Sequence, residues 1–182
     1  TGATTFGALS INSGSTVAKT LTLGAGTVLT STTSLSLDNS STGAFTLNGE
    51  TLAAQGPSIN VDDRSYAGTT VFLINGTGNQ VLTGSATLTV GALPPLTINK
   101  PAGTLTLAGT LRLGKALTYT AGIVDPGAST LALFDTLAIS GSFSLWNLVF
   151  NSNSTSGKTI TLGAGSNLNV LGTLTFDNSL AG

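Results

Sequence analysis

The sequence contains no cysteine, histidine or methionine among its 182 residues. Without cysteine the chain cannot form disulfides or thiolate metal sites. Without histidine and cysteine it cannot assemble a Ser–His–Asp triad, a Cys–His pair or a zinc site of the usual kind, which excludes most hydrolase mechanisms. The sequence therefore predicts a protein that is not an enzyme and that needs no cofactor.

Charged residues are also scarce, at 7% of the chain against about 25% in an ordinary soluble domain. The six basic residues are scattered and the net charge is −1, so no basic patch is expected for nucleic acid or for a membrane surface. No run of 18 apolar residues occurs, which argues against membrane insertion as a helix. Abundant threonine, serine, glycine and asparagine are typical of secreted bacterial surface proteins, and we expect an extracellular location at the cell surface.

Short segments in which apolar and hydroxyl residues alternate make up most of the chain. Alternation with period two predicts β-strands that bury one side and expose the other. The clearest segments are residues 20–23, 34–37, 44–47, 87–90, 104–107 and 173–176. No segment shows the apolar stripe of an amphipathic helix, so the sequence predicts an all-β protein.

The spacing of these segments predicts how the strands connect. Between residues 105 and 148 a strand begins about every six residues, and corners such as 108–109 and 121–122 are only two or three residues long. Such corners suit a parallel β-solenoid, or β-helix, in which three short strands make one coil. Coils of about 20 residues would give about nine coils and a rod about 43 Å long.

An antiparallel β-sandwich is the alternative fold, because it is also built from short alternating strands. The dipeptides Asn48-Gly49 and Asn75-Gly76 favour hairpin turns. The six-residue step and the long uncharged ladders favour the solenoid.

Two segments interrupt the alternation. Residues 49–68 hold four of the thirteen charged residues and predict an irregular excursion or lateral loop. Pro94 and Pro95 lack backbone donors, so residues 91–95 are expected to form a corner rather than a central strand. The chain as a whole, residues 1–182, is expected to form a single solenoid segment.

Residues 9–43 recur as residues 148–182 at a constant offset of 139, with 18 identities in 35 pairs. The longest shared run is Thr22-Leu23-Gly24-Ala25-Gly26, which matches residues 161–165. Repeats at a fixed period are typical of solenoids and filaments. The repeat predicts a window of a longer tandem array, with its two copies on equivalent turns about seven coils apart.

The irregular segment also contains the best candidate metal ligands. Glu50, Asp62 and Asp63 carry carboxylate oxygens suited to calcium, although their spacing matches no EF-hand. Paired carboxylates can also hydrolyse polysaccharides, but adjacent strand residues such as Asp62 and Asp63 point to opposite faces. We therefore expect a solvated loop here rather than a catalytic or metal site.

Two further features concern the surface. Trp146 is the only tryptophan, and alternation places it outside the solenoid, as a lateral contact with another chain or a platform for a glycan. Pairs of threonines at 20/22, 104/106, 159/161 and 173/175 would form an ice-binding hydroxyl face if they stacked on one side of successive coils. Threonine is also simply favourable on an exposed strand.

The alternating leucine and threonine and the glycine corners of residues 96–107 and 117–122 resemble the repeats of large bacterial surface proteins. These are proteins of the adhesin and autotransporter type, often described as haemagglutinin-like, and they are built as parallel β-helices. The resemblance implies an extracellular rod for adhesion, matrix or filament formation, and it carries over no site residue.

The sequence therefore predicts a structural building block of an extracellular rod or filament. The open end of a solenoid presents unpaired N–H and C=O groups, and the sequence shows no polar or proline-rich cap. Covalent tandem repeats, or self-association of identical chains end to end, would extend the rod. The competing hypothesis is an adhesin module that binds a glycan or a host surface through residues 49–68 and Trp146.

Overall fold

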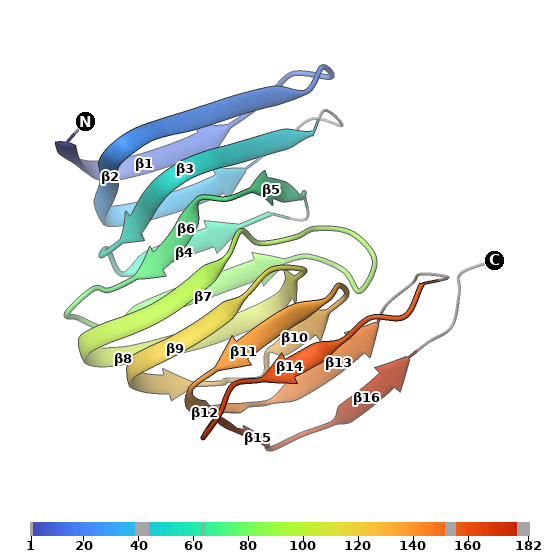
Figure 1. Cartoon of the computed structure of the whole chain (residues 1–182). Helices are drawn as coiled ribbons and strands as arrows, with labels where there is room; N and C mark the ends of the chain where they lie inside the picture. Colours follow the sequence, from blue (N-terminus) through green and yellow to red (C-terminus); the bar gives the residue numbers. More distant parts are fainter. Residues whose placement is uncertain (1, 39–43, 63, 152–155, 178–182) are drawn as a thin grey trace.

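The structure is a computed structural model that describes residues 2–38, 44–62, 64–151 and 156–177. Its described residues form strands, turns and bends, and Figure 1 shows the strands stacked in successive turns from the N-terminal to the C-terminal end. The strands are β1 (Gly2–Asn12), β2 (Lys19–Asp38), β3 (Phe45–Ala54), β4 (Ser58–Val61), β5 (Tyr66–Gly68), β6 (Val71–Ile74), β7 (Gln80–Ser85), β8 (Leu96–Leu113), β9 (Leu117–Asp125), β10 (Thr130–Leu133), β11 (Leu137–Ser140), β12 (Ser142–Leu145), β13 (Asn147–Asn151), β14 (Ile160–Leu162), β15 (Asn167–Val170) and β16 (Leu174–Asp177).

The pairings between these strands are parallel, and each joins a strand to one about a turn further along the chain. The predicted parallel β-solenoid is therefore confirmed, and the antiparallel sandwich is excluded. The solenoid has about 7 turns rather than nine. Most turns are longer than 20 residues, as where Leu174 pairs with Leu148, although Asn147 pairs with Thr130 across only 17. At about 4.8 Å per turn the stack is about 34 Å long.

Each full turn places chain segments on three faces in a fixed order. Face 1 contains residues 19–23, 45–49, 66–68, 92–93, 110–113, 130–133, 147–151 and 174–177. Face 2 contains residues 28–31, 51–54, 71–74, 96–98, 117–119, 137–140 and 160–162. Face 3 contains residues 34–37, 58–61, 81–85, 105–109, 123–125, 142–145 and 167–170. Residues 2–6 and 8–12 of β1 continue faces 2 and 3 at the N-terminal end.

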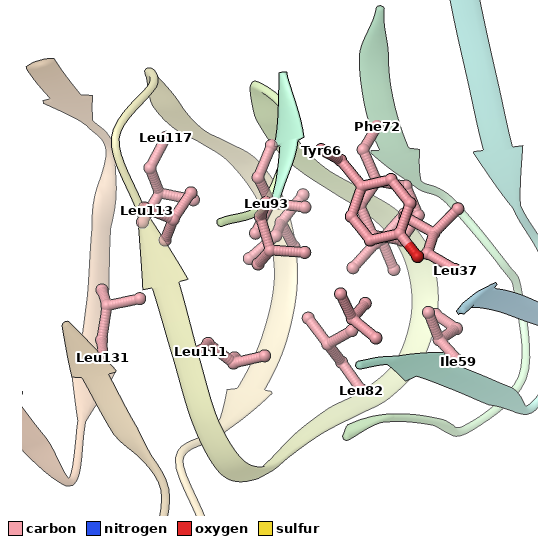
Figure 2. Close-up of a cluster of buried hydrophobic side chains, with 14 of the residues drawn as sticks. Leu37, Ile59, Tyr66, Phe72, Leu82, Leu93, Leu111, Leu113, Leu117 and Leu131 are labelled. Carbon is pink, nitrogen blue, oxygen red and sulfur yellow. The ribbon is translucent and has the colours of Figure 1, made fainter. Parts of the chain in front are cut away.

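The core is a set of apolar columns inside the tube, because parallel in-register pairing stacks like positions on one another. On face 3, Leu9, Leu35, Ile59, Leu82 and Leu107 form one such column. Figure 2 shows Ile59 and Leu82 among the buried side chains that point into the interior. Fully burying a side chain of this size contributes about 1.5–3 kcal/mol, so the columns are the main source of stability.

Glycines make the tightest corners, where backbones of successive turns approach each other. Gly49 has φ +96°, and a Cβ atom there would lie 2.0 Å from the carbonyl oxygen of Leu23. Gly109 has φ +68°, and its Cβ would lie 2.1 Å from the oxygen of Gly84. An L-side chain fits neither the backbone conformation nor the space. The predicted corner at residues 108–109 is confirmed.

Residues 49–68 do not leave the solenoid, so the predicted excursion is wrong. Residues 51–54 pair with β2 and β6, β4 pairs with β2 and β7, and β5 pairs with β3. The charges that obscured the alternation lie at corners: Glu50 is exposed between faces 1 and 2, and Asp62 follows β4. Between these corners, Leu52 and Ile59 are each 1% exposed and supply the core.

The lateral loop lies instead at residues 86–91, so the predicted strand at 87–90 is wrong. A side-chain turn competes with the ladder there, because Thr87 Oγ1 accepts hydrogen bonds from the N–H groups of Thr89 (3.2 Å) and Val90 (2.9 Å). The corner predicted at the two prolines is confirmed, and the oxygen of Pro95 accepts a hydrogen bond from the N–H of Phe72 at 2.8 Å.

Candidate functional site

Both ends of the solenoid present strand edges without a neighbouring strand in the described part of the chain. At the C-terminal end, β14, β15 and β16 each pair only with a strand of the preceding turn. At the N-terminal end, β1 pairs only with β2, and residues 19–23 of β2 pair only with β3. Edges of this kind are where a further strand can be added.

The C-terminal end is also the open mouth of the apolar core. A cavity of about 540 Å³ opens there between the last two turns. Leu162 and Leu174 are each 50% exposed, and Phe176 is 75% exposed although its column is buried further inside. The rings of Phe150 and Phe176 stack with their centroids 4.8 Å apart. Clustered apolar exposure of this kind marks an association surface.

Polar side chains border this mouth on two sides. Lys158 Nζ lies 3.0 Å from Asp135 Oδ1. The hydrogen bond from Lys158 lowers the pKa of the Asp135 carboxyl, with a smaller contribution from the backbone N–H of Thr136. Asn151 Nδ2 donates to Asp177 Oδ2 at 3.4 Å, across the last pairing of face 1. The rim is therefore polar and the centre apolar, as at protein interfaces.

The N-terminal end is a second, less apolar mouth. Thr4 and Phe6 pair with Leu29 and Ser31 on face 2, and Phe6 is 39% exposed. Ile11, on face 3, is already 7% exposed because its neighbours in the next turn cover it. The two ends thus differ in how much core they leave open.

The two copies of the repeat have the same local structure where the structure describes them. Asn12 stacks on Asp38 and donates a side-chain hydrogen bond to it at 3.4 Å, as Asn151 does to Asp177. The shared Gly-Ala-Gly corner has the same backbone conformation in both copies, with φ +73° at Gly26 and at Gly165. The repeat therefore encodes one complete turn of the solenoid.

The copies do not occupy equivalent positions on the rod, contrary to expectation. Residues 19–23 and 28–31 lie on faces 1 and 2, whereas their counterparts in β14 and β15 lie on faces 2 and 3. Residues 34–37 lie on face 3, and their counterpart β16 lies on face 1. The second copy is therefore displaced by one face, about a third of a turn, because turns of unequal length do not divide 139 residues evenly.

A buried polar cluster, which the sequence analysis missed, links three turns at the corner between faces 2 and 3. Lys100 is 1% exposed, and its Nζ donates to the oxygens of Gly76 (2.8 Å) and Gly78 (2.8 Å) and to Gln80 Oε1 (2.7 Å). Gln80 Nε2 in turn donates to the oxygen of Gly56 at 2.8 Å. Desolvation by burial lowers the pKa of the Lys100 ammonium group.

The signal for this cluster was present in the sequence. Leu96, Ile98 and Lys100 follow strict alternation, which directs Lys100 inward with its two apolar neighbours. Its partners are corner carbonyl groups that would otherwise lack donors, so the ammonium group satisfies them. The arrangement is a fastener between turns, and it offers no open position for a ligand.

A second cation fastens the lateral loop. Arg112 Nε donates to the oxygen of Leu88 at 3.0 Å and Nη1 donates to that of Gly91 at 2.7 Å. The guanidinium also lies 3.4 Å from the centroid of the Phe134 ring, a cation–π contact. Burial lowers the pKa of Arg112 to about 10. Arg112 therefore has a structural role in holding residues 86–91 against face 1.

The structure does not gather the predicted calcium ligands into a site. Glu50 and Asp62 lie at different corners, and Asp63 lies outside the described residues. Asp62 Oδ1 accepts hydrogen bonds from the Arg64 N–H (3.0 Å) and from the Tyr66 hydroxyl (3.3 Å). Within the described ranges, no group of three acidic side chains is placed to hold a metal ion.

The two surface predictions are placed as follows. Trp146 is 40% exposed at the corner between β12 and β13, next to Gly172 of the following turn. The threonine pairs lie on different faces: residues 20/22 on face 1, 104/106 on face 3 and 159/161 on face 2. They do not stack on successive turns, so these pairs do not form an ice-binding array.

No protein-family model, curated protein or solved structure matches this chain. The residues that the structure describes include no helix long and apolar enough to cross a membrane. Arguments about function therefore rest on the fold and on the two open ends.

Proposed function

We propose that this chain is a structural building block of an extracellular rod or filament of the adhesin type, extended by strand addition at the ends of the solenoid. The observation that carries the proposal is the open C-terminal turn. There the free edges of β14, β15 and β16 surround an exposed apolar core, with Phe176 75% exposed. Added strands would satisfy the edges and bury the core together.

The sides of the rod support a structural role. The outward positions of face 3 carry small, mostly hydroxyl side chains in ladders, for example Ser34, Ser58 and Thr106. Buried cations fasten the corners, and the described residues contain no cluster of catalytic or metal-binding groups outside them. The molecule has regular sides and reactive ends, which is the property of a unit that polymerises along one axis.

Electron microscopy and light scattering of the purified chain test this proposal. The chain is expected to form rods much longer than the roughly 34 Å of one unit. Phe176→Asp places a charge in the apolar mouth and is expected to leave single units, because an unpaired charge cannot be buried. Thr175→Asp is the matched control: it adds the same charge on the outward side of β16 and should leave assembly intact.

Discrete units at every concentration, or rods that form equally well with Phe176→Asp, would contradict the proposal. Single units that bind a glycan array through the exposed Trp146 ring would instead favour an adhesin module, since aromatic faces are common sugar platforms.

A further inference from the structure

We infer that the C-terminal end is a docking surface for the first turn of a following repeat unit, a turn with the inward side chains of residues 45–61. This inference rests on the proposed rod and specifies what its end receives. The occupant is identified from the molecule itself, because the first copy of the repeat shows how this sequence is covered.

In the first copy, a complete turn covers the repeat from its C-terminal side. Inward residues of β2 pair one to one with inward residues of β3 and β4: Leu21 with Leu47, Leu29 with Leu52, Leu35 with Ile59 and Leu37 with Val61. As a result Leu35 is 1% exposed and Leu37 is fully buried. Residues 45–61 are therefore a turn shaped to close this repeat.

The second copy presents the same inward residue types without that cover. The counterparts of the four leucines are Ile160, Leu168, Leu174 and Phe176. Leu174 is 50% exposed and Phe176 is 75% exposed, and the cavity of about 540 Å³ lies among them. Chemistry that buries four side chains in one copy is thus available, unused, in the other.

The backbone of the second copy is ready for the same pairing. The Gly26 and Gly165 corners share φ +73°, so the strands that follow each corner leave it in the same direction. A docked turn would place a residue like Leu47 beside Ile160 and one like Ile59 beside Leu174. The next unit would begin one face later, and the loop at residues 86–91 would return to the same side of the rod after three units.

The N-terminal end of a second copy is the competing occupant. Its inward positions include Thr4, Phe6 and Leu9. It carries a threonine where residues 45–61 carry Leu52, which pairs with the same inward position, Leu29. Residues 45–61 match the apolar surface at every inward position, so they are the better fit.

Hydrogen exchange of an extended chain tests the inference. In this variant, residues 44–68 are repeated directly after residue 182. The control carries the same extension with Leu47→Ser, Leu52→Ser and Ile59→Ser in the appended segment only. Amides of residues 160–177 are expected to exchange at least about tenfold more slowly in the extended chain than in the original, because they acquire strand partners. The control is expected to give no such protection.

Unchanged exchange of residues 160–177 in the extended chain would overturn the inference, as would equal protection by the control extension. Protection that appears only as the concentration of the original chain rises, with no effect of the extension, would also overturn it and assign the end to a second copy. Rod formation by the original chain is a separate measurement, so either proposal can fail while the other stands.

Discussion

The two copies of the repeat are nearly the same sequence in two different environments. Leu35 and Leu174 are equivalent residues on strands of the same kind, yet they are 1% and 50% exposed. The first copy is covered by the turn that follows it, and the second is the last turn that the structure describes. Burial in a solenoid is therefore decided by the neighbouring turn rather than by the strand itself.

Features inside one turn, in contrast, are the same in both copies. The hydrogen bond between Asn12 and Asp38 recurs between Asn151 and Asp177 at the same 3.4 Å. The corner conformation recurs as well. The comparison separates effects that a turn carries with it from effects that its neighbours confer, and three measurements test that separation.

The largest difference is expected between Leu35→Ala and Leu174→Ala. Leu35→Ala leaves a cavity in a closed column and should lower the free energy of unfolding by about 2–5 kcal/mol. Leu174→Ala removes a side chain that water already reaches, and its cost should be below about 1.5 kcal/mol. Urea denaturation of both variants measures this difference. Equal costs would mean that the second copy is as closed as the first.

An intermediate and equal effect is expected for Gly26→Ala and Gly165→Ala. Both glycines have φ +73°, and no other atom lies within 4 Å of an added Cβ. Only backbone strain opposes the methyl group, at about 1–2 kcal/mol per residue in the left-handed region. The two variants should therefore lose the same stability in thermal unfolding. A clear difference between them would show that the corners respond to their neighbours after all.

The smallest effect concerns the ion pair of Lys158 and Asp135, which belongs to the open end alone. The pKa of Asp135 lies below its ordinary value of 3.8 in the folded chain. Its contribution is therefore present above about pH 4 and is lost as the pH falls through the folded pKa. Because the pair is partly exposed, Asp135→Asn should remove at most about 0.5 kcal/mol of this acid dependence.

Unfolding titrations of the original chain and of Asp135→Asn between about pH 2 and about pH 6 measure this effect. Salt at about 1 M should shrink it, because screening weakens exposed pairs. Identical pH profiles for the two chains would show that the pair contributes nothing to the open end.

Much of the fold followed from the sequence, because alternation and short glycine corners are local signals. The parallel solenoid and the corners at residues 91–95 and 108–109 were predicted correctly. Residues 49–68 were misjudged because their charges lie at corners, where they interrupt the pattern without leaving the stack. Residues 87–90 were misjudged because Thr87 forms a side-chain turn in a segment that alternates like a strand.

The candidate site was only partly predictable. The sequence indicated open ends, but the carboxylates Glu50 and Asp62 lie at separate corners. The buried cation Lys100 went unnoticed, although its alternation with Leu96 and Ile98 was visible. A charged residue at an inward position is credible only once acceptors are known to surround it, and these come from the preceding turn.

By itself, the sequence determined the turn: which side chains face inward, where glycine permits a corner, and that one turn recurs 139 residues later. The tertiary structure decided how turns meet. It placed the second copy one face away from the first, gave Lys100 its carbonyl partners and left Phe176 exposed. The physical reason is that strand pairing and corner geometry are local, whereas stacking depends on the summed lengths of all the turns between two segments.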